Sequence, residues 1–360
     1  MTIPRGERML MRGNEAIAQG ALDAGCRAFF GYPITPQNQI PEYFAAHMPE
    51  AGGAFLQAES EVSAINMVYG AAAAGVRAMT ASSSPGISLK QEGISYIAES
   101  ELPCVIVNIM RGGSGLGNIA PAQADYFQSV KGGGHGDYRT LVFAPWSVQE
   151  LYDLTREAFE IADRYRTPVL ILADALLGQM MEPVVIPTEV VDPASLPRKP
   201  WATDGAQGRG RNIVNSLYIA PADLEEVNLR LQARYNEAAR REVRCTSEEL
   251  EDAEFAVIAY GTAARVAATA VEKARGKGLR VGLFRPISLY PFPSAQIAEL
   301  AGRVKAILVV EMSIGQFVED VRLAVEGRCA VHLLGRTGGI VPTPAEVVEE
   351  IERLPGEGTG

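Results

Sequence analysis

A hydroxyl group lies between two prolines in the segment Gly-Tyr-Pro-Ile-Thr-Pro, residues 31–36, directly after an apolar run. Proline fixes the backbone φ angle, so the Thr35 hydroxyl is held at a defined geometry that suits contact with a ligand. Ligands in open α/β sheets bind at the carboxyl ends of strands, and this segment is therefore a predicted binding loop. The structural alternative is that Thr35 caps the helix that follows.

Two glutamates, Glu59 and Glu61, open a long helical pattern. The helix dipole favours carboxylates in the first turn, and this explanation suffices for Glu59. Glu61 differs because apolar residues flank it on both sides, among them Ala58 and Val62. A carboxyl group in such surroundings can hold or pass a proton, so Glu61 is a candidate for acid–base chemistry.

Two glycine-rich loops carry further polar groups. The first, Arg-Gly-Gly-Ser-Gly-Leu-Gly-Asn at residues 111–118, offers an arginine that can bind a carboxylate through two hydrogen bonds. It matches neither a dinucleotide fingerprint nor a phosphate-binding P-loop. The second loop, residues 131–139, places His135 in an open setting, but no nucleophile motif accompanies it to form a catalytic triad.

The elements that must position these groups alternate between short apolar runs and helical patterns. Strands are predicted at residues 28–32, 53–57, 77–81, 105–109, 141–144 and 168–172. Such alternation is typical of an α/β fold, a parallel sheet with helices on both faces. The turn Ser-Ser-Ser-Pro-Gly at residues 82–86 is expected to cap a helix that runs to Glu99.

The chain divides into three predicted parts. Residues 1–190 form the first domain, and residues 251–360 form a second, smaller α/β domain. Residues 191–250 read as a linker, rich in proline and glycine at first and then forming a charged, mostly exposed helix at residues 223–243.

Composition excludes several classes of protein. The 360 residues include 33 Lys and Arg against 43 Asp and Glu, a net charge of −10, which argues against binding to nucleic acid or to an anionic membrane. Cys26, Cys104, Cys245 and Cys329 are scattered and form no Cys-x-x-Cys pair, so the chain by itself supplies neither a metal site nor an iron–sulfur cluster. No signal-peptide pattern or membrane-spanning run is present, and we expect a cytoplasmic protein.

The motifs together resemble those of a known family. The Gly-Tyr-Pro-Ile-Thr-Pro loop, the glutamate before an Ala-rich helix ending Val-Tyr-Gly-Ala-Ala-Ala-Ala-Gly at residues 68–75, and the Arg-Gly-Gly loop are similar to the α subunit of 2-oxoacid:ferredoxin oxidoreductases. Residues 81–89 and 131–139 look most like the branched-chain (2-oxoisovalerate) type. The resemblance covers residues 13–183 and again 255 to the end, where the second domain resembles the C-terminal domain of transketolase-like enzymes.

The resemblance implies an enzyme made of several subunits. The first domain would be the pyrimidine-binding domain of a thiamine diphosphate enzyme, which converts a 2-oxo acid and coenzyme A to acyl-CoA and CO2 by oxidative decarboxylation. A β subunit would carry the Gly-Asp-Gly motif for Mg2+ and the diphosphate, since here Gly136-Asp137 is followed by Tyr138. [4Fe-4S] clusters on γ and ferredoxin-like δ subunits would pass electrons to ferredoxin.

The family's site residues carry over by position. Glu61 matches the catalytic glutamate that hydrogen-bonds N1′ of the cofactor's aminopyrimidine ring. Thr35 and Arg111 match residues that bind the substrate. The resemblance also implies that Tyr32, Pro33 and Ile34 bind the cofactor. Asn118 and His135 are further candidate site residues.

Three alternatives stay open. One is the 2-oxoglutarate type within the same family. Another is the β-type subunit of a lipoamide-dependent 2-oxo acid dehydrogenase, or a transketolase relative, to which the Tyr-Pro-Ile-Thr-Pro loop is poorly suited. The third is a non-catalytic assembly or binding subunit, against which the joint presence of Thr35, Glu61 and Arg111 argues.

Overall fold

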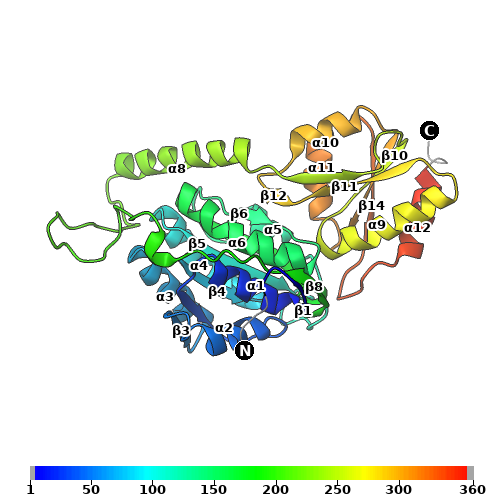
Figure 1. Ribbon diagram of the computed structural model, residues 1–360. Helices are drawn as coiled ribbons and strands as arrows, with labels where there is room; N and C mark the ends of the chain where they lie inside the picture. Colours follow the sequence, from blue (N-terminus) through cyan, green and yellow to red (C-terminus); the bar gives the residue numbers. More distant parts are fainter. Residues whose placement is uncertain (1–4, 355–360) are drawn as a thin grey trace.

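A computed structural model describes residues 5–354. Its larger sheet has seven strands in the order β12-β6-β7-β5-β4-β2-β3, all parallel except β12, which pairs antiparallel with β6 (Figure 1). The strands are β2 (Ala28–Gly31), β3 (Ala54–Gln57), β4 (Ala78–Ser82), β5 (Cys104–Met110), β6 (Leu141–Phe143), β7 (Pro168–Asp174) and β12 (Ser288–Tyr290).

Helices cover both faces of this sheet because its central strands are apolar on both sides. Along β5, Val105 and Val107 point into one core and Ile106 into the other. The seven helices between β1 and β8 are α1 (Gly13–Asp23), α2 (Gln39–His47), α3 (Glu61–Ala73), α4 (Pro85–Glu99), α5 (Tyr126–Val130), α6 (Val148–Tyr165) and α7 (Ala175–Gln179). Residues of α1, α2 and α6 build one core, and residues of α3 and α4 build the other.

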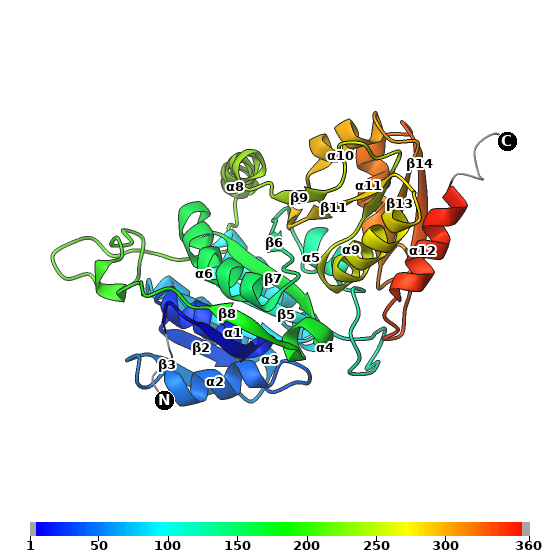
Figure 2. The same cartoon turned by 45° about the vertical axis from the view of Figure 1, so that its right-hand side comes forward.

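The second sheet has five strands in the order β14-β13-β10-β11-β9, with β9 antiparallel. Its strands and helices are β9 (Cys245–Glu248), β10 (Phe255–Ile258), α9 (Gly261–Gly276), β11 (Val281–Pro286), α10 (Ser294–Ala301), β13 (Ala306–Glu311), α11 (Phe317–Val325), β14 (Ala330–Gly335) and α12 (Pro344–Arg353). Helices α9 and α12 pack side by side on one face (Figure 2). The predicted fold class, a parallel α/β sheet followed by a smaller α/β domain, is confirmed.

The two sheets are joined more closely than two domains on a linker. Strand β12 comes from the second half of the chain and lies at the edge of the first sheet (Figure 1). Helices α10 and α11 share one apolar core with α3 and α4. Strand β9 falls inside the predicted linker range 191–250 but belongs to the second sheet.

The remaining elements lie outside both sheets. Strands β1 (Arg8–Arg12) and β8 (Met181–Val185) form an antiparallel pair that the sequence did not predict. After a 3-10 turn, η1 (Pro193–Ser195), the predicted charged helix is found as α8 (Pro221–Arg241), which stands apart from the sheets (Figures 1 and 2). Its Arg230 and Arg234 pair with Glu101 of the first domain.

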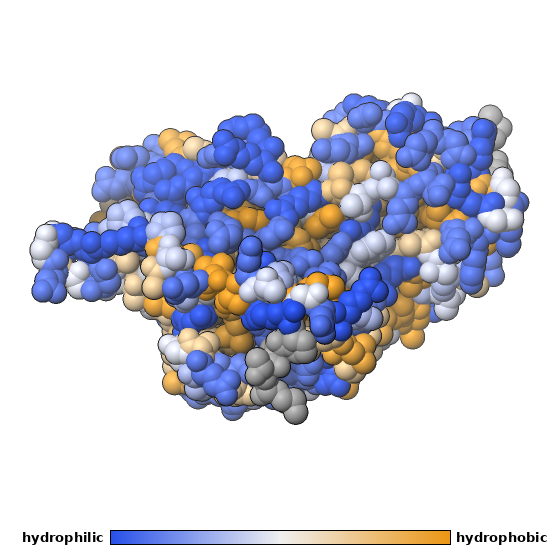
Figure 3. Space-filling model, in the orientation of Figure 1, coloured by the Kyte–Doolittle hydropathy of each residue, from blue (hydrophilic) through white to orange (hydrophobic). Residues whose placement is uncertain are grey.

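The surface in Figure 3 is mostly polar, with apolar areas over the larger domain. Within residues 5–354, no helix combines the length and apolar character that crossing a bilayer requires. The N-terminal segment, for which the sequence predicts no signal peptide, starts at residue 1. Residues 1–4 lie outside the described range.

Candidate active site

The structure brings three predicted residues to one edge of the large sheet. Strands β5, β4, β2 and β3 are consecutive neighbours and parallel, so their carboxyl ends form one row. Arg111 follows β5, Thr35 lies in the loop after β2, and Glu61 begins the helix after β3. This is the edge at which open α/β sheets bind ligands.

Glu61 is held at the start of α3 by the cap that precedes it. The Ser63 backbone N–H donates to Ser60 Oγ at 3.2 Å, which fixes the first turn, and only 6% of Glu61 is exposed. No hydrogen bond to the Glu61 carboxylate is found within residues 5–354. Glu59, in contrast, is exposed and accepts a hydrogen bond from the Ser63 hydroxyl, as a purely structural residue would.

Gly86 allows α4 to approach the Glu61 carboxylate closely. A Cβ atom at this position would lie 2.6 Å from Glu61 Oε1 and 2.1 Å from Ser82 Oγ, so no other residue fits without displacing them. The hydroxyls of Ser82 and Ser83 are buried and have no hydrogen-bond partner within the described part of the chain. The end of β4 therefore carries two unsatisfied hydroxyls, and that of Ser82 lies near the carboxylate.

The prediction that serine side chains of residues 82–86 cap α4 is wrong. Ser84 stands at the N-cap position of α4, but its side chain makes no capping hydrogen bond. Its hydroxyl instead donates to Asp125 at 2.6 Å and accepts from the Arg111 backbone N–H at 3.0 Å. Asn108 also donates to Asp125, at 2.9 Å, while burial raises the pKa of Asp125 and these hydrogen bonds oppose the rise.

The Arg111 guanidinium lies against the threonine loop. Its Nη1 donates to the Thr35 carbonyl at 2.9 Å and its Nη2 to the Leu116 carbonyl at 3.2 Å. The side chain is buried, and its Nε–H has no partner within residues 5–354. Arginine has five N–H donors, so this group keeps capacity for an anionic ligand.

Thr35 itself is exposed and does not cap α2, whose N-cap residue is Asn38. Tyr32 and Pro33 are also exposed on the same loop, and Ile34 is half-buried. Thr35 borders a cavity of about 470 Å3, whose other lining residues are Pro36, Asn38, Gln39, Ile119, Pro121, Ala175, Leu176 and Gln179.

Asn118 holds the glycine loop in place. Its side-chain amide donates to the Gly338 carbonyl at 2.9 Å, and its Oδ1 accepts from the Ala120 backbone N–H at 2.9 Å. The amide thus connects the loop after β5 to the second domain. Its donor and acceptor are used within the chain, which is the pattern of a residue that positions the loop.

His135 is not brought to this row. It is exposed in the loop 131–139, and its carbonyl accepts a hydrogen bond from Ser95 at 2.7 Å near the end of α4. At a rise of 1.5 Å per residue, Ser95 lies about 14 Å along the helix from Gly86. The Gly136-Asp137 pair lies in this same distant loop.

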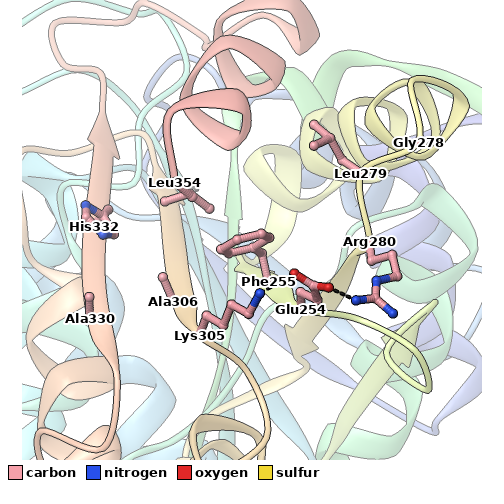
Figure 4. A pocket seen from close by; sticks show the side chains of 10 residues that line it. All are labelled: Glu254, Phe255, Gly278, Leu279, Arg280, Lys305, Ala306, Ala330, His332 and Leu354. Atoms are coloured by element: carbon pink, nitrogen blue, oxygen red, sulfur yellow. Dashed lines mark hydrogen bonds and ion pairs between the residues drawn. The ribbon is translucent and has the colours of Figure 1, made fainter. Parts of the chain in front are cut away.

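A separate cavity of about 310 Å3 lies at the opposite, amino-terminal end of the second sheet (Figure 4). Glu254 points between Arg280 and Lys305 and pairs with both, so the charged side chains at the cavity are engaged with one another. Its rim reaches Leu354, the last described residue.

Family models match both domains. Residues 19–267 match the model described as "Pyruvate flavodoxin/ferredoxin oxidoreductase, thiamine diP-bdg", and residues 253–347 match "Pyruvate:ferredoxin oxidoreductase core domain II". The chain is 52% identical to the ketoisovalerate oxidoreductase subunit VorB of Methanothermobacter thermautotrophicus, covering 97% of this chain and 98% of that protein. The chain belongs to the 2-oxoacid:ferredoxin oxidoreductase family.

Other members of the 2-oxoacid:ferredoxin oxidoreductase family are more distant. The 2-oxoglutarate synthase subunit KorA of the same organism is 37% identical, with 97% of this chain and 99% of that one covered. A solved structure, 2-oxoglutarate:ferredoxin oxidoreductase from Magnetococcus marinus with 2-oxoglutarate, coenzyme A and succinyl-CoA bound, superposes with a TM-score of 0.85 at 25% identity. This chain is covered to 98% and spans 66% of that chain.

A split-gene transketolase superposes with a TM-score of 0.60 at 14% identity over 96% of this chain and 98% of that one, which shows a shared fold. The family membership makes this chain a subunit of a thiamine diphosphate-dependent oxidoreductase that acts on 2-oxo acids. The resemblance inferred from the motifs is confirmed.

Proposed function

We propose that this chain is the α subunit of a branched-chain 2-oxoacid:ferredoxin oxidoreductase. The complex would convert 2-oxoisovalerate and coenzyme A to acyl-CoA, CO2 and reduced ferredoxin. The observation that carries the proposal is the placement of Thr35, Glu61 and Arg111 on one row of strand ends, beside the close-approach glycine Gly86.

The residues around Glu61 fit the aminopyrimidine end of thiamine diphosphate. The absent side chain of Gly86 lets α4 pack directly against the Glu61 carboxylate, which fixes its position, and the hydroxyls of Ser82 and Ser83 at the end of β4 are buried and unpaired within residues 5–354. The bound cofactor supplies the carbanion chemistry. Glu61 holds the proton at ring atom N1′, while Tyr32, Pro33 and Ile34 contact the ring from the loop after β2.

Arg111 and Thr35 bind the substrate's carboxylate and carbonyl. Arg111 uses one N–H of each Nη atom within the chain, so further N–H groups remain for a carboxylate, and Thr35 is exposed on the neighbouring loop. The carboxylate leaves as neutral CO2, so an arginine facing it contributes mainly to substrate binding rather than to the rate of bond cleavage.

The cavity beside Thr35 supports an apolar substrate side chain. Ile119, Pro121, Ala175 and Leu176 line it, and neither lysine nor arginine is among its lining residues. A 2-oxoglutarate side chain would bring a second carboxylate, which needs a second cation. The chain is also more similar to the ketoisovalerate subunit VorB than to the 2-oxoglutarate subunit KorA of the same organism, which points the same way. The substrate profile of the assembled complex tests this choice: a preference for 2-oxoglutarate over branched-chain acids would contradict it.

A partner subunit completes the site. Apolar side chains surround the row and are exposed in this chain: Leu56, Val62, Leu89, Leu116 and Ile119. Such a concentration is typical of a surface that another protein covers. The partner is the β subunit, which carries the Mg2+ and diphosphate motif.

The iron–sulfur clusters belong to other subunits, γ and δ, which deliver electrons to ferredoxin. Cys26 and Cys104 are buried in different cores of the first domain, and Cys245 and Cys329 are half-buried in the second sheet or at its border. Four thiolates so arranged cannot converge on one cluster.

Replacing Glu61 by glutamine tests the proposal. The amide fills the same space but cannot share a proton with N1′, so turnover should fall at least 100-fold, the lower end of the usual contribution of acid–base groups. Reduction of a viologen dye by the assembled complex is the assay, with thermal unfolding as the control for folding. Wild-type turnover in this variant would refute the role of Glu61 and favour a non-catalytic subunit.

A further inference from the structure

Lys90 is a buried lysine on the helix that packs against Glu61. Its side chain is fully buried, with 0% exposed, in the middle of α4. Its Nζ donates a hydrogen bond to the Glu61 backbone carbonyl at 3.4 Å. Gly86, which touches the Glu61 carboxylate, lies four residues earlier, and residues four apart share one helix face. The face of α4 that meets Glu61 therefore carries a glycine in close contact with the carboxylate and, one turn later, an amine.

A buried ammonium group requires a compensating partner, because burying a charge is costly unless an opposite charge lies nearby. The single hydrogen bond to a carbonyl leaves most of its donor capacity unused. Burial lowers the pKa of Lys90 to about 8, and the charge of Glu61 opposes this lowering. The hydrogen-bond partner of the Lys90 amine within residues 5–354 is the Glu61 backbone carbonyl, so Glu61 is the residue beside the buried charge.

We propose that Lys90 is a positioning residue for proton transfer at Glu61, whose ammonium group favours the carboxylate form of Glu61. The consequence concerns the proton shared between Glu61 and atom N1′ of bound thiamine diphosphate. When the Glu61 O–H bond breaks, the N1′–H bond forms, and the charge of Lys90 favours that direction. This inference rests on the proposed function of Glu61, but it adds a residue that acts through Glu61 rather than on the cofactor.

The test is the exchange of the thiazolium C2 proton of thiamine diphosphate for deuterium. The assembled complex, loaded with Mg2+ and thiamine diphosphate, is mixed with D2O and quenched in acid, and the released cofactor is read by NMR. This measurement needs no turnover, and therefore reports on the proton relay without the later steps. Four proteins form a double-mutant cycle: wild type, Lys90→Met, Glu61→Gln and the double variant.

Lys90→Met removes the charge that favours proton transfer from Glu61, so it should slow C2 exchange by about 10- to 100-fold. In the Glu61→Gln background the same change should alter the rate less than about threefold, because the group through which Lys90 acts is gone. An equal slowing in both backgrounds, or no slowing in the first, would overturn the inference.

Two further variants separate charge from packing. Lys90→Gln keeps a donor for the Glu61 carbonyl but has no charge, and it should slow exchange as Lys90→Met does. Lys90→Gln also provides the test if Lys90→Met does not assemble. A wild-type exchange rate in Lys90→Gln would refute the inference. Ile94→Met, which alters a buried side chain one turn further along α4, should leave the rate within about twofold.

The exchange rates also distinguish a failure of the role of Lys90 from a failure of the proposed function of Glu61. If Glu61→Gln leaves exchange at the wild-type rate, the proposed function of Glu61 fails. If Glu61→Gln slows exchange while the neutral Lys90 variants do not, only the role of Lys90 fails.

Discussion

Substituting Gly86 by alanine probes the site at its tightest contact. The added Cβ would lie 2.6 Å from Glu61 Oε1, where ordinary contacts begin near 3.4 Å, so the carboxylate must move by about 0.8 Å. Ser82 Oγ, at 2.1 Å, must move further. A misplacement of about 1 Å in a reacting constellation can cost roughly 100-fold in rate, and we expect that loss in kcat.

The cost to folding should be far smaller. Overpacking typically costs about 1–3 kcal/mol, while alanine is favoured over glycine in a helix by up to about 1 kcal/mol. The atoms in the way belong to two side chains that can rotate, and the free energy of unfolding should therefore fall by about 0–2 kcal/mol. Gly86→Ala should therefore lose most of its activity while keeping most of its stability.

The assay is viologen reduction by the assembled complex, with kcat and the KM for the 2-oxo acid measured separately. Arg111 and Thr35 are on other loops, so KM should change less than about threefold. Gly70→Ala is the matched control, because Gly70 lies in α3, where a Cβ would meet nothing within 4 Å. That variant should keep full activity.

Two results would refute the reasoning. Full activity of Gly86→Ala would show that the position of the Glu61 carboxylate does not limit the reaction. A large loss of activity in Gly70→Ala would show that any added methyl group on α3 or α4 disturbs the complex. The loss in Gly86→Ala could then not be attributed to the position of the Glu61 carboxylate.

Further predictions concern the loop after β5 and assembly. Arg111→Ala should raise the KM for the 2-oxo acid by about 30-fold or more, since losing a charge-assisted contact in a desolvated site costs roughly 2–5 kcal/mol, whereas an unchanged KM would make the residue structural. Asn118→Ala should lower the free energy of unfolding by about 1 kcal/mol and raise KM moderately, because the tie to Gly338 is lost; calorimetry and kinetics measure the two effects. Titration calorimetry of the isolated chain with Mg2+ and thiamine diphosphate should show weak binding or none, and tight binding would contradict a site shared with the β subunit.

Much of the fold could be predicted because its signals are local. The apolar runs of β4, β5 and β7 and the helical patterns between them each lie within one short window of sequence, and a parallel sheet follows from their alternation. The rule that ligands bind at strand ends predicted a binding loop at Thr35, and the structure places Glu61 and Arg111 on the same edge of the sheet.

What the sequence did not predict depends on partners distant along the chain. The three residues of β12 pair with β6, which precedes them by more than 140 positions, and no local pattern encodes that pairing. Strand β8 contains Pro183, a residue that strands tolerate only at an edge, so its pattern is weak. The serine-rich turn at residues 82–86 was expected to cap α4, but Ser84, which stands at the N-cap position, bonds Asp125 and the Arg111 backbone N–H through its hydroxyl instead.

Lys90 did leave a signal in the sequence. It occupies the position between Gly86 and Ile94 at intervals of four residues, on a stripe whose other members are small or apolar. A lysine on the apolar stripe of a helix that follows a strand end is a departure from the binary pattern, and such departures concentrate at functional sites.

The second domain contributes to the site without supplying a reacting group. The Gly338 carbonyl holds Asn118 at one end of the segment after Arg111. At the other end, Gln123 bonds the Met312 backbone through its own backbone N–H and its side chain, and donates from its side chain to the Tyr260 carbonyl. The loop that presents Arg111 is thus fixed at two points on the second domain, while Arg111 itself is fixed on the Thr35 loop of the first. Because both domains share one apolar core, movement between them would displace the arginine from the row, and the rigidity of the substrate site follows from the packing of the whole chain.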